Sequence, residues 1–123
     1  MDNHSGKFGE NFAVSLLESK GYQIEARNFR SRFGEIDIIA SNQKYIVFVE
    51  VKTRSSSCLV DPLSSITSAK QKRIVKTACC YLQKYPSELQ PRFDVIGVLT
   101  DRYGEEVLST DYLVNAFDVR GMF

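Results

Sequence analysis

Hydrophobic residues recur along the chain at two different spacings, one typical of helices and one typical of strands. In residues 7–20 the apolar positions are three or four residues apart, and Gly21 follows as a helix stop. These positions are Phe8, Phe12, Ala13, Leu16 and Leu17. Residues 22–29 mix aromatic and β-branched side chains, which favours a strand. The pattern therefore predicts a helix followed by a strand.

The rest of the chain alternates between strands and one more helix. Residues 35–40 and 45–52 predict two strands around the polar turn 41–44, and the serine-rich residues 53–66 predict a loop. Thr67 or Ser68 then caps a second helix that runs to about residue 85. Residues 93–99 and 105–113 predict two final strands around the turn 101–104. The order α-β-β-β-α-β-β predicts an α/β fold, with a mixed sheet flanked by two helices.

Composition and length add limits to this picture. The chain has 123 residues, of which 43% are hydrophobic and 25% charged, and it contains no long linker. These values are typical of one globular domain, so we expect residues 1–123 to form a single domain. The longest apolar run, residues 45–49, is far shorter than the roughly 20 residues that span a bilayer. Since residues 1–7 are polar and unlike a signal peptide, we expect a cytoplasmic protein with no membrane contact.

The charge is distributed unevenly although the net charge is only +1. Residues 1–26 carry two basic and four acidic side chains (−2), residues 27–76 ten and four (+6), and residues 77–123 four and seven (−3). A basic middle segment is typical of a surface that binds a polyanion, but it also fits an ordinary solvated face.

Cysteine and histidine usage restricts the possible chemistry. Cys58, Cys79 and Cys80 form no CxxC pair or zinc-like spacing, which predicts three reduced thiols. The single histidine, His4, lies near the start of the chain, which argues against a Ser-His or Cys-His catalytic site. Any catalysis should therefore use carboxylates and lysine, with or without a metal ion.

The central hairpin carries the most informative polar residues. Side chains alternate along a strand, so Asp37, Glu50 and Lys52 are expected on one face of the hairpin. A turn centred between residues 42 and 43 would pair positions whose numbers sum to 85, which places Asp37 opposite Phe48 and Glu35 opposite Glu50. The other face would be apolar and belong to the core: Ile36, Ile38, Val47, Val49 and Val51.

This polar face has two interpretations. In the first, Lys52 neutralises the two acids in a structural salt bridge. In the second, Asp37 and Glu50 supply oxygen ligands to Mg²⁺ or Mn²⁺, and Lys52 orients a water molecule and stabilises charge on a phosphate. The second set of groups is suited to phosphodiester hydrolysis.

The same residues resemble a known motif and a known family. Asp37 followed by Glu50-Val51-Lys52 resembles the PD-(D/E)xK motif of restriction-endonuclease-like nucleases. Residues 7–99 resemble the YraN family of small uncharacterised bacterial proteins, which are similar to archaeal Holliday-junction resolvases. The blocks that carry this resemblance are Gly9-Glu10, Arg27-Asn28-Phe29-Arg30, Gly34-Glu35-Ile36-Asp37, Phe48-Val49-Glu50-Val51-Lys52-Thr53-Arg54 and Arg92-Phe93-Asp94-Val95.

The resemblance implies a restriction-endonuclease-like core and a role for several residues. Asp37 and Glu50 would be metal ligands and Lys52 the catalytic lysine. Glu10 would be the helix-borne acid of the site, although a solvated glutamate in the first helical turn is an equal alternative. Ile36 stands where the motif's name has proline. The loop at residues 58–62 lacks the glycine usual in relatives, which leaves its part in substrate binding open.

Two further polar residues have two interpretations each. Gln71 lies on the apolar face of the second helix, where its amide would bond either the catalytic water or Lys52, or else cap a neighbouring loop. Glu35 would either join the site or pair with an arginine such as Arg54, and the pairing is favoured on energetic grounds.

The predicted function follows from these residues together. We expect a metal-dependent endonuclease or a nuclease-like protein that binds nucleic acid, with DNA favoured and branched DNA as one substrate. Resolvase-like relatives act as two-fold dimers, which makes a homodimer plausible. Eight basic residues would contact phosphates: Arg27, Arg30, Arg32, Arg54, Lys70, Lys72, Arg73 and Lys76. The alternatives are a non-catalytic nucleic-acid-binding module, and a protein-interaction domain whose charged residues form a structural network.

Overall fold

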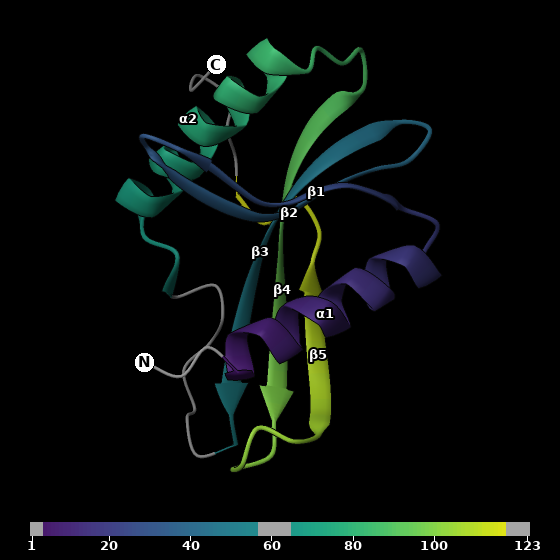
Figure 1. Ribbon diagram of the computed structural model, residues 1–123, viewed down its shortest axis with the longest axis vertical. Coiled ribbons are helices and arrows are strands. Elements are labelled where there is room, and N and C mark those ends of the chain that lie inside the picture. The colour runs from purple at the N-terminus through teal and green to yellow at the C-terminus, as the bar shows by residue number, and fades with distance from the viewer. Residues whose placement is uncertain (1–3, 57–64, 118–123) are drawn as a thin grey trace.

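The computed structural model describes residues 4–56 and 65–117, with backbone only for residues 4–6. The predicted α/β class and element order are confirmed, and element boundaries differ from the prediction by at most three residues. Residues 58–62 and Cys58 lie outside the described residues. The elements are α1 (His4–Ser19), β1 (Gln23–Ser31), β2 (Gly34–Ser41), β3 (Tyr45–Ser55), α2 (Ser68–Lys84), β4 (Gln90–Thr100) and β5 (Val107–Leu113) (Figure 1).

The ends of the two helices follow from local sequence. At the end of α1, Gly21 adopts a left-handed backbone (φ 91°) and donates its N–H to the carbonyl of Glu18, while Tyr22 donates to Leu17. Glycine adopts this conformation at little cost, so it ends the helix as predicted. At the start of α2, the side chain of Thr67 accepts a hydrogen bond from the backbone N–H of Lys70, which selects Thr67 as the cap.

The five strands form one mixed sheet with β3 at its centre. Their order in the sheet is the order in the chain, β1-β2-β3-β4-β5. β3 and β4 run parallel, and the other neighbouring pairs are antiparallel. A parallel pair needs a crossover connection, and α2 lies in that connection.

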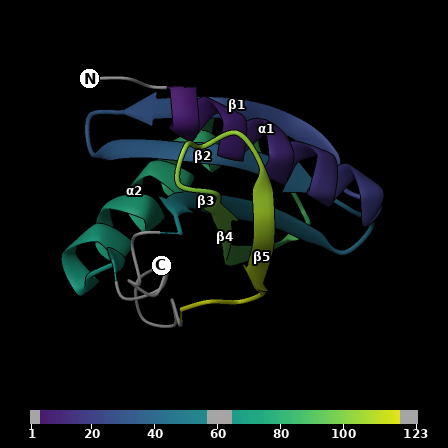
Figure 2. The same ribbon diagram turned by 90° about the horizontal axis from the view of Figure 1, so that it is seen from below.

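The two helices cover opposite faces of the sheet (Figures 1 and 2). On one face, Leu17 of α1 packs in a buried cluster with Val49 of β3. On the other, Tyr81 of α2 packs in a second cluster with Phe48 of β3. Since neighbouring residues of a strand point to opposite faces, β3 is buried on both sides, which explains its continuous apolar run.

β2 and β3 separate halfway along their length. They pair only from Ser41–Ile46 to Ile38–Val49, whereas β3 pairs with β4 along its whole length. Residues 34–37 of β2 are therefore not paired with residues 50–55 of β3. We call the opening between these two segments the fork. In Figure 1, β1 and β2 curve away from the lower halves of β3 and β4 at this level.

The fork corrects two predictions about the hairpin. Paired positions sum to 87 rather than 85, as in Ile38–Val49, so Asp37 does not lie opposite Phe48. The predicted common core face is also wrong for Ile36, which packs in the cluster of α2 while Ile38 packs in the cluster of α1. The facing of β2 changes at Asp37, between them. Asn28, which is aligned with Asp37 by the pairing of β1 and β2, has a left-handed backbone (φ 52°) that asparagine tolerates.

A buried ionic network joins β4 to its surroundings away from the fork. Asp94 is only 1% exposed and accepts hydrogen bonds from the Nε and Nη2 atoms of Arg92 at 3.0 and 2.8 Å. It also accepts from the hydroxyl of Tyr112 at 2.6 Å and the backbone N–H of Asn115 at 2.9 Å. Arg92 donates in turn to the hydroxyl of Tyr22 at 2.6 Å. Because every buried charge has a partner, the network ties β4 and β5 to the α1–β1 junction.

Two predictions about composition can be compared with the described residues. No helix in residues 4–56 and 65–117 is long and apolar enough to cross a membrane. Cys79 and Cys80 are free thiols, as predicted, and Cys79 packs against the α2 cluster.

Candidate functional site

Asp37 lies at the branch point of the fork. Its Oδ2 atom accepts a hydrogen bond of 2.7 Å from the backbone N–H of Val51 in β3. In a continued hairpin, that N–H would face β2. The side chain of Asp37 therefore satisfies a donor on the separated strand, which explains how two neighbouring strands diverge without leaving this group unpaired.

The environment of Asp37 disfavours its charged form. Burial raises the pKa of Asp37 from 3.8 to about 7, and the negative charges of Glu50, Glu10 and Glu35 act in the same direction. The hydrogen bond from Val51 acts in the opposite direction but does not compensate. No ion pair within residues 4–56 and 65–117 includes Asp37. Asp37 therefore lies in a crowded acidic environment, and among the described residues it attracts Lys52 without forming an ion pair with it.

Glu50, in contrast, contacts two lysines. Its Oε1 atom lies 3.3 Å from Nζ of Lys52 and 3.5 Å from Nζ of Lys70, and its side chain is 11% exposed. Burial acts to lower the pKa of Lys52, but a hydrogen bond with Lys70 and the charge of Glu50 outweigh it, so this pKa is raised. Burial and the contact with Lys52 lower the pKa of Lys70. The amino groups of two lysines thus meet at one carboxylate, where they can also meet a phosphate.

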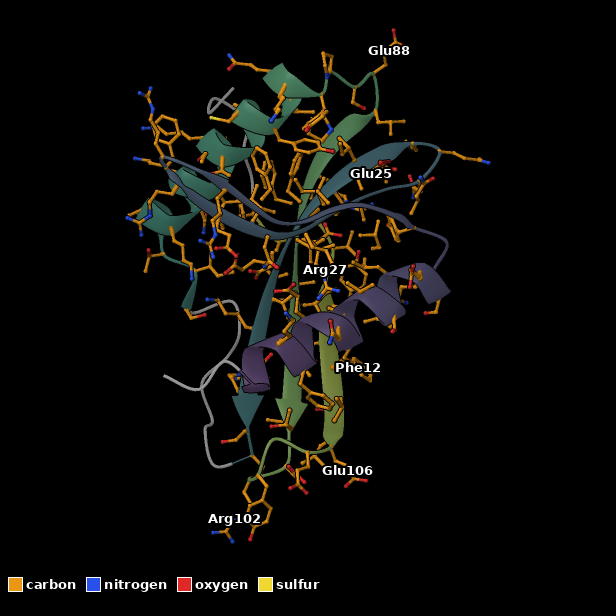
Figure 3. The ribbon with its side chains drawn as sticks, in the orientation of Figure 1. Phe12, Glu25, Arg27, Glu88, Arg102 and Glu106 are labelled. Carbon is orange, nitrogen blue, oxygen red and sulfur yellow. The ribbon has the colours of Figure 1, made fainter. Side chains whose placement is uncertain are left out.

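Glu10 faces the sheet rather than solvent. Its carboxylate accepts from Arg27 at 3.0 Å and from the side-chain amide of Asn28 at 3.0 Å, and it is 13% exposed. Figure 3 shows Arg27 in the space between α1 and the strands. Helix α1 approaches this closely because residue 9 is glycine: a Cβ atom there would overlap the hydroxyl of Thr53. The solvated alternative for Glu10 is therefore wrong.

Glu35 pairs with an arginine, but not with the expected one. It accepts from Nε of Arg30 at 3.0 Å and from Asn28 at 3.1 Å. The amide of Asn28 thus bridges Glu10 and Glu35. Arg54 instead has a buried Nε atom without a hydrogen-bond partner among the described residues.

Gln71 follows the loop-capping alternative. Its side-chain amide donates to the carbonyl oxygen of Ile66 at 3.2 Å, just before α2. The predicted contact with Lys52 or a catalytic water is not needed to satisfy this donor, so we assign Gln71 to holding the start of α2 and, through it, the backbone that carries Lys70.

The eight predicted phosphate-binding residues separate into three groups. Arg27 and Arg30 hold acids beside the fork, and Lys70 contacts Glu50 within it. Arg54 is half-buried. The remaining four are exposed and lie on α2 or on the turn before β2: Arg32, Lys72, Arg73 and Lys76.

The groups of the fork that could bind a divalent cation are two carboxylates, those of Asp37 and Glu50. No group of three or more histidine, cysteine, aspartate or glutamate residues suited to a metal occurs in the part of the chain described. Asp37 and Glu50 nevertheless raise each other's energy by like-charge repulsion, and a cation between them would relieve it. Mg²⁺ commonly binds through one or two carboxylates and takes its other ligands from water and substrate phosphate. The donors present therefore fit such a cation.

Sequence reasoning missed Asn28 and the position of Lys70 at Glu50. Asn28 belongs to the block Arg27-Asn28-Phe29-Arg30 that carried the family resemblance. Its left-handed backbone, which the sequence pattern does not show, directs its side-chain amide toward Glu10 and Glu35. Lys70 was expected on a nucleic-acid surface. The spacing of residues along the chain could not show that the connection from β3 to β4 brings the start of α2 close to β3.

Comparison with known sequences gives consistent matches over most of the chain. The sequence model of the family described as "Uncharacterised protein family UPF0102" matches residues 9–98. A UPF0102 protein of Chlorobium phaeobacteroides is 43% identical over 116 residues, covering 91% of this chain and 92% of the relative. A UPF0102 protein of Dictyoglomus turgidum is 42% identical over 113 residues, covering 91% and 95%. One from Clostridium botulinum strain Hall is 43% identical over 116 residues, covering 93% and 94%.

Proposed function

The chain belongs to the uncharacterised protein family UPF0102, as its resemblance to the YraN proteins predicted, and we propose that it is a metal-dependent endonuclease. The site would be the fork, with Asp37 and Glu50 as ligands of Mg²⁺ or Mn²⁺ and Lys52 as the catalytic lysine. Glu10 would act beside them by holding Arg27 and Asn28 in place.

One observation carries this proposal: the charges in the fork are paired unequally. Glu10 and Glu35 each form an ion pair with an arginine, and Glu50 forms ion pairs with two lysines. No ion pair of the described residues includes Asp37, although its charge acts on Lys52. In a purely structural network, the second lysine would be expected beside Asp37, where it would remove an unfavourable interaction. The separation of an unpaired acid from a pair of lysines favours a site for a cation and an anion together.

The chemistry of the residues agrees with hydrolysis of a phosphodiester. When bound, a divalent cation would polarise the phosphate and lower the pKa of a bound water. Lys52 and Lys70 present their amino groups toward the same space, where they can bind a phosphate oxygen and stabilise the charge that develops on it. Asp37, held by Val51, keeps its carboxylate fixed at the branch point.

The proposed substrate is nucleic acid, with DNA favoured and branched DNA as one form. Exposed cations on α2 lie on the same element as Lys70, so a backbone bound along α2 would lead into the fork. A homodimer that engages two strands is part of the proposal.

The test is cleavage of branched, duplex and single-stranded DNA, and of RNA, with Mg²⁺ or Mn²⁺. Asp37→Asn, Glu50→Gln and Lys52→Ala should each abolish cleavage, since loss of one acid–base group alone costs roughly 10²–10⁴ in rate. Lys44→Ala is the matched control, because Lys44 is exposed at the turn that begins β3 and lies away from the fork.

Each outcome points to one function. Full cleavage by Lys52→Ala would contradict the assigned site. Salt-sensitive binding without cleavage in any metal would indicate the non-catalytic nucleic-acid-binding module. Absence of both binding and cleavage would indicate the protein-interaction domain with a structural charge network.

A further inference from the structure

A second surface of the molecule combines an aromatic ring, two cations and a cavity. Phe33, in the turn between β1 and β2, has the guanidinium carbon of Arg32 4.8 Å from its ring centroid and Nζ of Lys76 5.3 Å from it. Beside this ring lies an open cavity of about 640 Å³ between the turn and α2, which Val75 and Cys79 also line.

The proposed hydrolytic site does not use these residues. Phe33 directly precedes Gly34, where the fork begins, and Asp37 lies four residues beyond Phe33. An extended chain therefore puts at most about 13 Å between the Cα atoms of Phe33 and Asp37. One strand of a nucleic acid advances about 3.4 Å per nucleotide, so this separation corresponds to roughly four nucleotides. A substrate bound in the fork would therefore reach the cavity.

The chemistry of the cavity suits one kind of occupant. Its wall is apolar at Phe33, Val75 and Cys79, and its rim carries the charges of Arg32 and Lys76. The guanidinium of Arg32 lies against the Phe33 ring, and a base would take the place of this flat group on the ring. An unpaired base presents a flat, weakly polar face together with adjoining phosphates, and aromatic rings and guanidinium groups are its usual stacking partners.

We infer that this cavity binds an unpaired nucleobase of the same nucleic acid, stacked on Phe33, while Arg32 and Lys76 hold the phosphates on either side of it. The inference rests on the proposed function and makes it more specific. The preferred substrate would carry an unpaired base about four nucleotides from the bond that is cut, as a branch, bulge or single-stranded end provides.

The test measures equilibrium binding by fluorescence anisotropy, in EDTA, to two labelled DNA duplexes that differ by one bulged base. Wild type should bind the bulged duplex about 5- to 150-fold more tightly, the range expected when one base stacks on an aromatic side chain. Phe33→Ala should bind both duplexes with the affinity that wild type shows for the paired one. Phe33→Tyr retains the ring and should retain the preference.

The chain offers a matched control at its opposite end. Tyr103 is 71% exposed and has the guanidinium of Arg102 5.4 Å from its ring centroid, in the turn between β4 and β5. Figure 3 shows Arg102 at the far end of the molecule from α2. Tyr103→Ala should leave the preference for the bulge unchanged, because no described part of the cavity lies there.

The outcomes separate this inference from the proposed function. Equal affinity of wild type for the two duplexes, or a preference that survives in Phe33→Ala, would overturn the base-binding cavity and leave the proposed function standing. An equal loss in Tyr103→Ala would also overturn it. Failure of wild type to bind either duplex or branched DNA would overturn the proposed function, and this inference with it.

Discussion

Neutralising Asp37 should stabilise the metal-free protein at neutral and alkaline pH. The substitution Asp37→Asn removes a buried negative charge that Glu50, Glu10 and Glu35 repel. The asparagine retains an oxygen that can accept the hydrogen bond from Val51. The change therefore removes the unfavourable charge and keeps the contact that holds β2 and β3 at the branch point.

The raised pKa sets the size and direction of the effect. Because burial and like charges raise the pKa of Asp37 from 3.8 to about 7, the folded protein binds this proton more tightly than the unfolded chain. The stabilising contribution of the proton is complete below pH 3.8 and is lost as the pH rises through about 7. A shift of about three pKa units corresponds to about 4 kcal/mol, which wild type should lose and Asp37→Asn should retain.

A divalent cation should narrow the difference in stability between the two proteins, although the stability that wild type gains does not offset the whole of its loss above pH 7. With a dissociation constant of about 1 mM and about 10 mM metal, wild type gains about 1.4 kcal/mol, or roughly 4 °C in melting temperature, and the mutant gains less. The assay is thermal unfolding of wild type and Asp37→Asn across pH, with EDTA and with Mg²⁺ or Mn²⁺.

The control is Asp111→Asn, which removes an exposed acid of β5 and should change neither the pH dependence nor the response to metal. A destabilised Asp37→Asn in EDTA at alkaline pH would show that Asp37 is held by a favourable structural interaction. Together with a wild type that does not respond to metal, this result would refute the assignment of the fork as a cation site.

Three further predictions concern other parts of the structure. Gly9→Ala should destabilise the protein by about 1–3 kcal/mol, because its Cβ overlaps Thr53, and adding Thr53→Ala should restore part of the loss in a denaturant titration. Arg73→Ala should make the slope of log K against log[salt] for duplex DNA less negative by about 1, from about −4 to −5 in wild type, whereas an unchanged slope would exclude a phosphate contact. Asp94→Ala should cost about 3–5 kcal/mol, because it leaves the charge of Arg92 buried without its carboxylate; a small loss would contradict the structural role of that pair.

The order of elements could be predicted because each has a local cause. Gly21 ends α1, Thr67 begins α2, and the two-sided apolar run of β3 predicts a central strand. The separation of β2 and β3 could not be predicted in this way. It depends on a change of facing at Asp37 and on a left-handed Asn28, and alternation along a strand assumes that neither occurs.

The candidate site shows the same division. The alternation of side chains along a strand predicted that Asp37, Glu50 and Lys52 lie together, and the structure places all three in the fork. The assumed pairing of β2 with β3 was nevertheless wrong by two positions. A shift of two positions keeps each side chain on the same face of the sheet, because side chains alternate with a period of two. The partners of Glu35 and Gln71 depend on how distant segments fold together, so spacing alone could not select them.

The blocks that carry the family resemblance do not all bear on catalysis, and the structure shows which ones to test for it. Arg92 and Asp94 form a buried pair tied to β5 and to Tyr22, away from the fork, so their loss should unfold the protein before it affects any reaction. Gly9 acts through the close approach of α1 to β3. Lys52, by contrast, shares Glu50 with a second lysine, Lys70, so its removal leaves Glu50 paired. A variant at Lys52 should therefore stay folded and lose function alone, which makes it the cleanest probe of chemistry in this family of proteins.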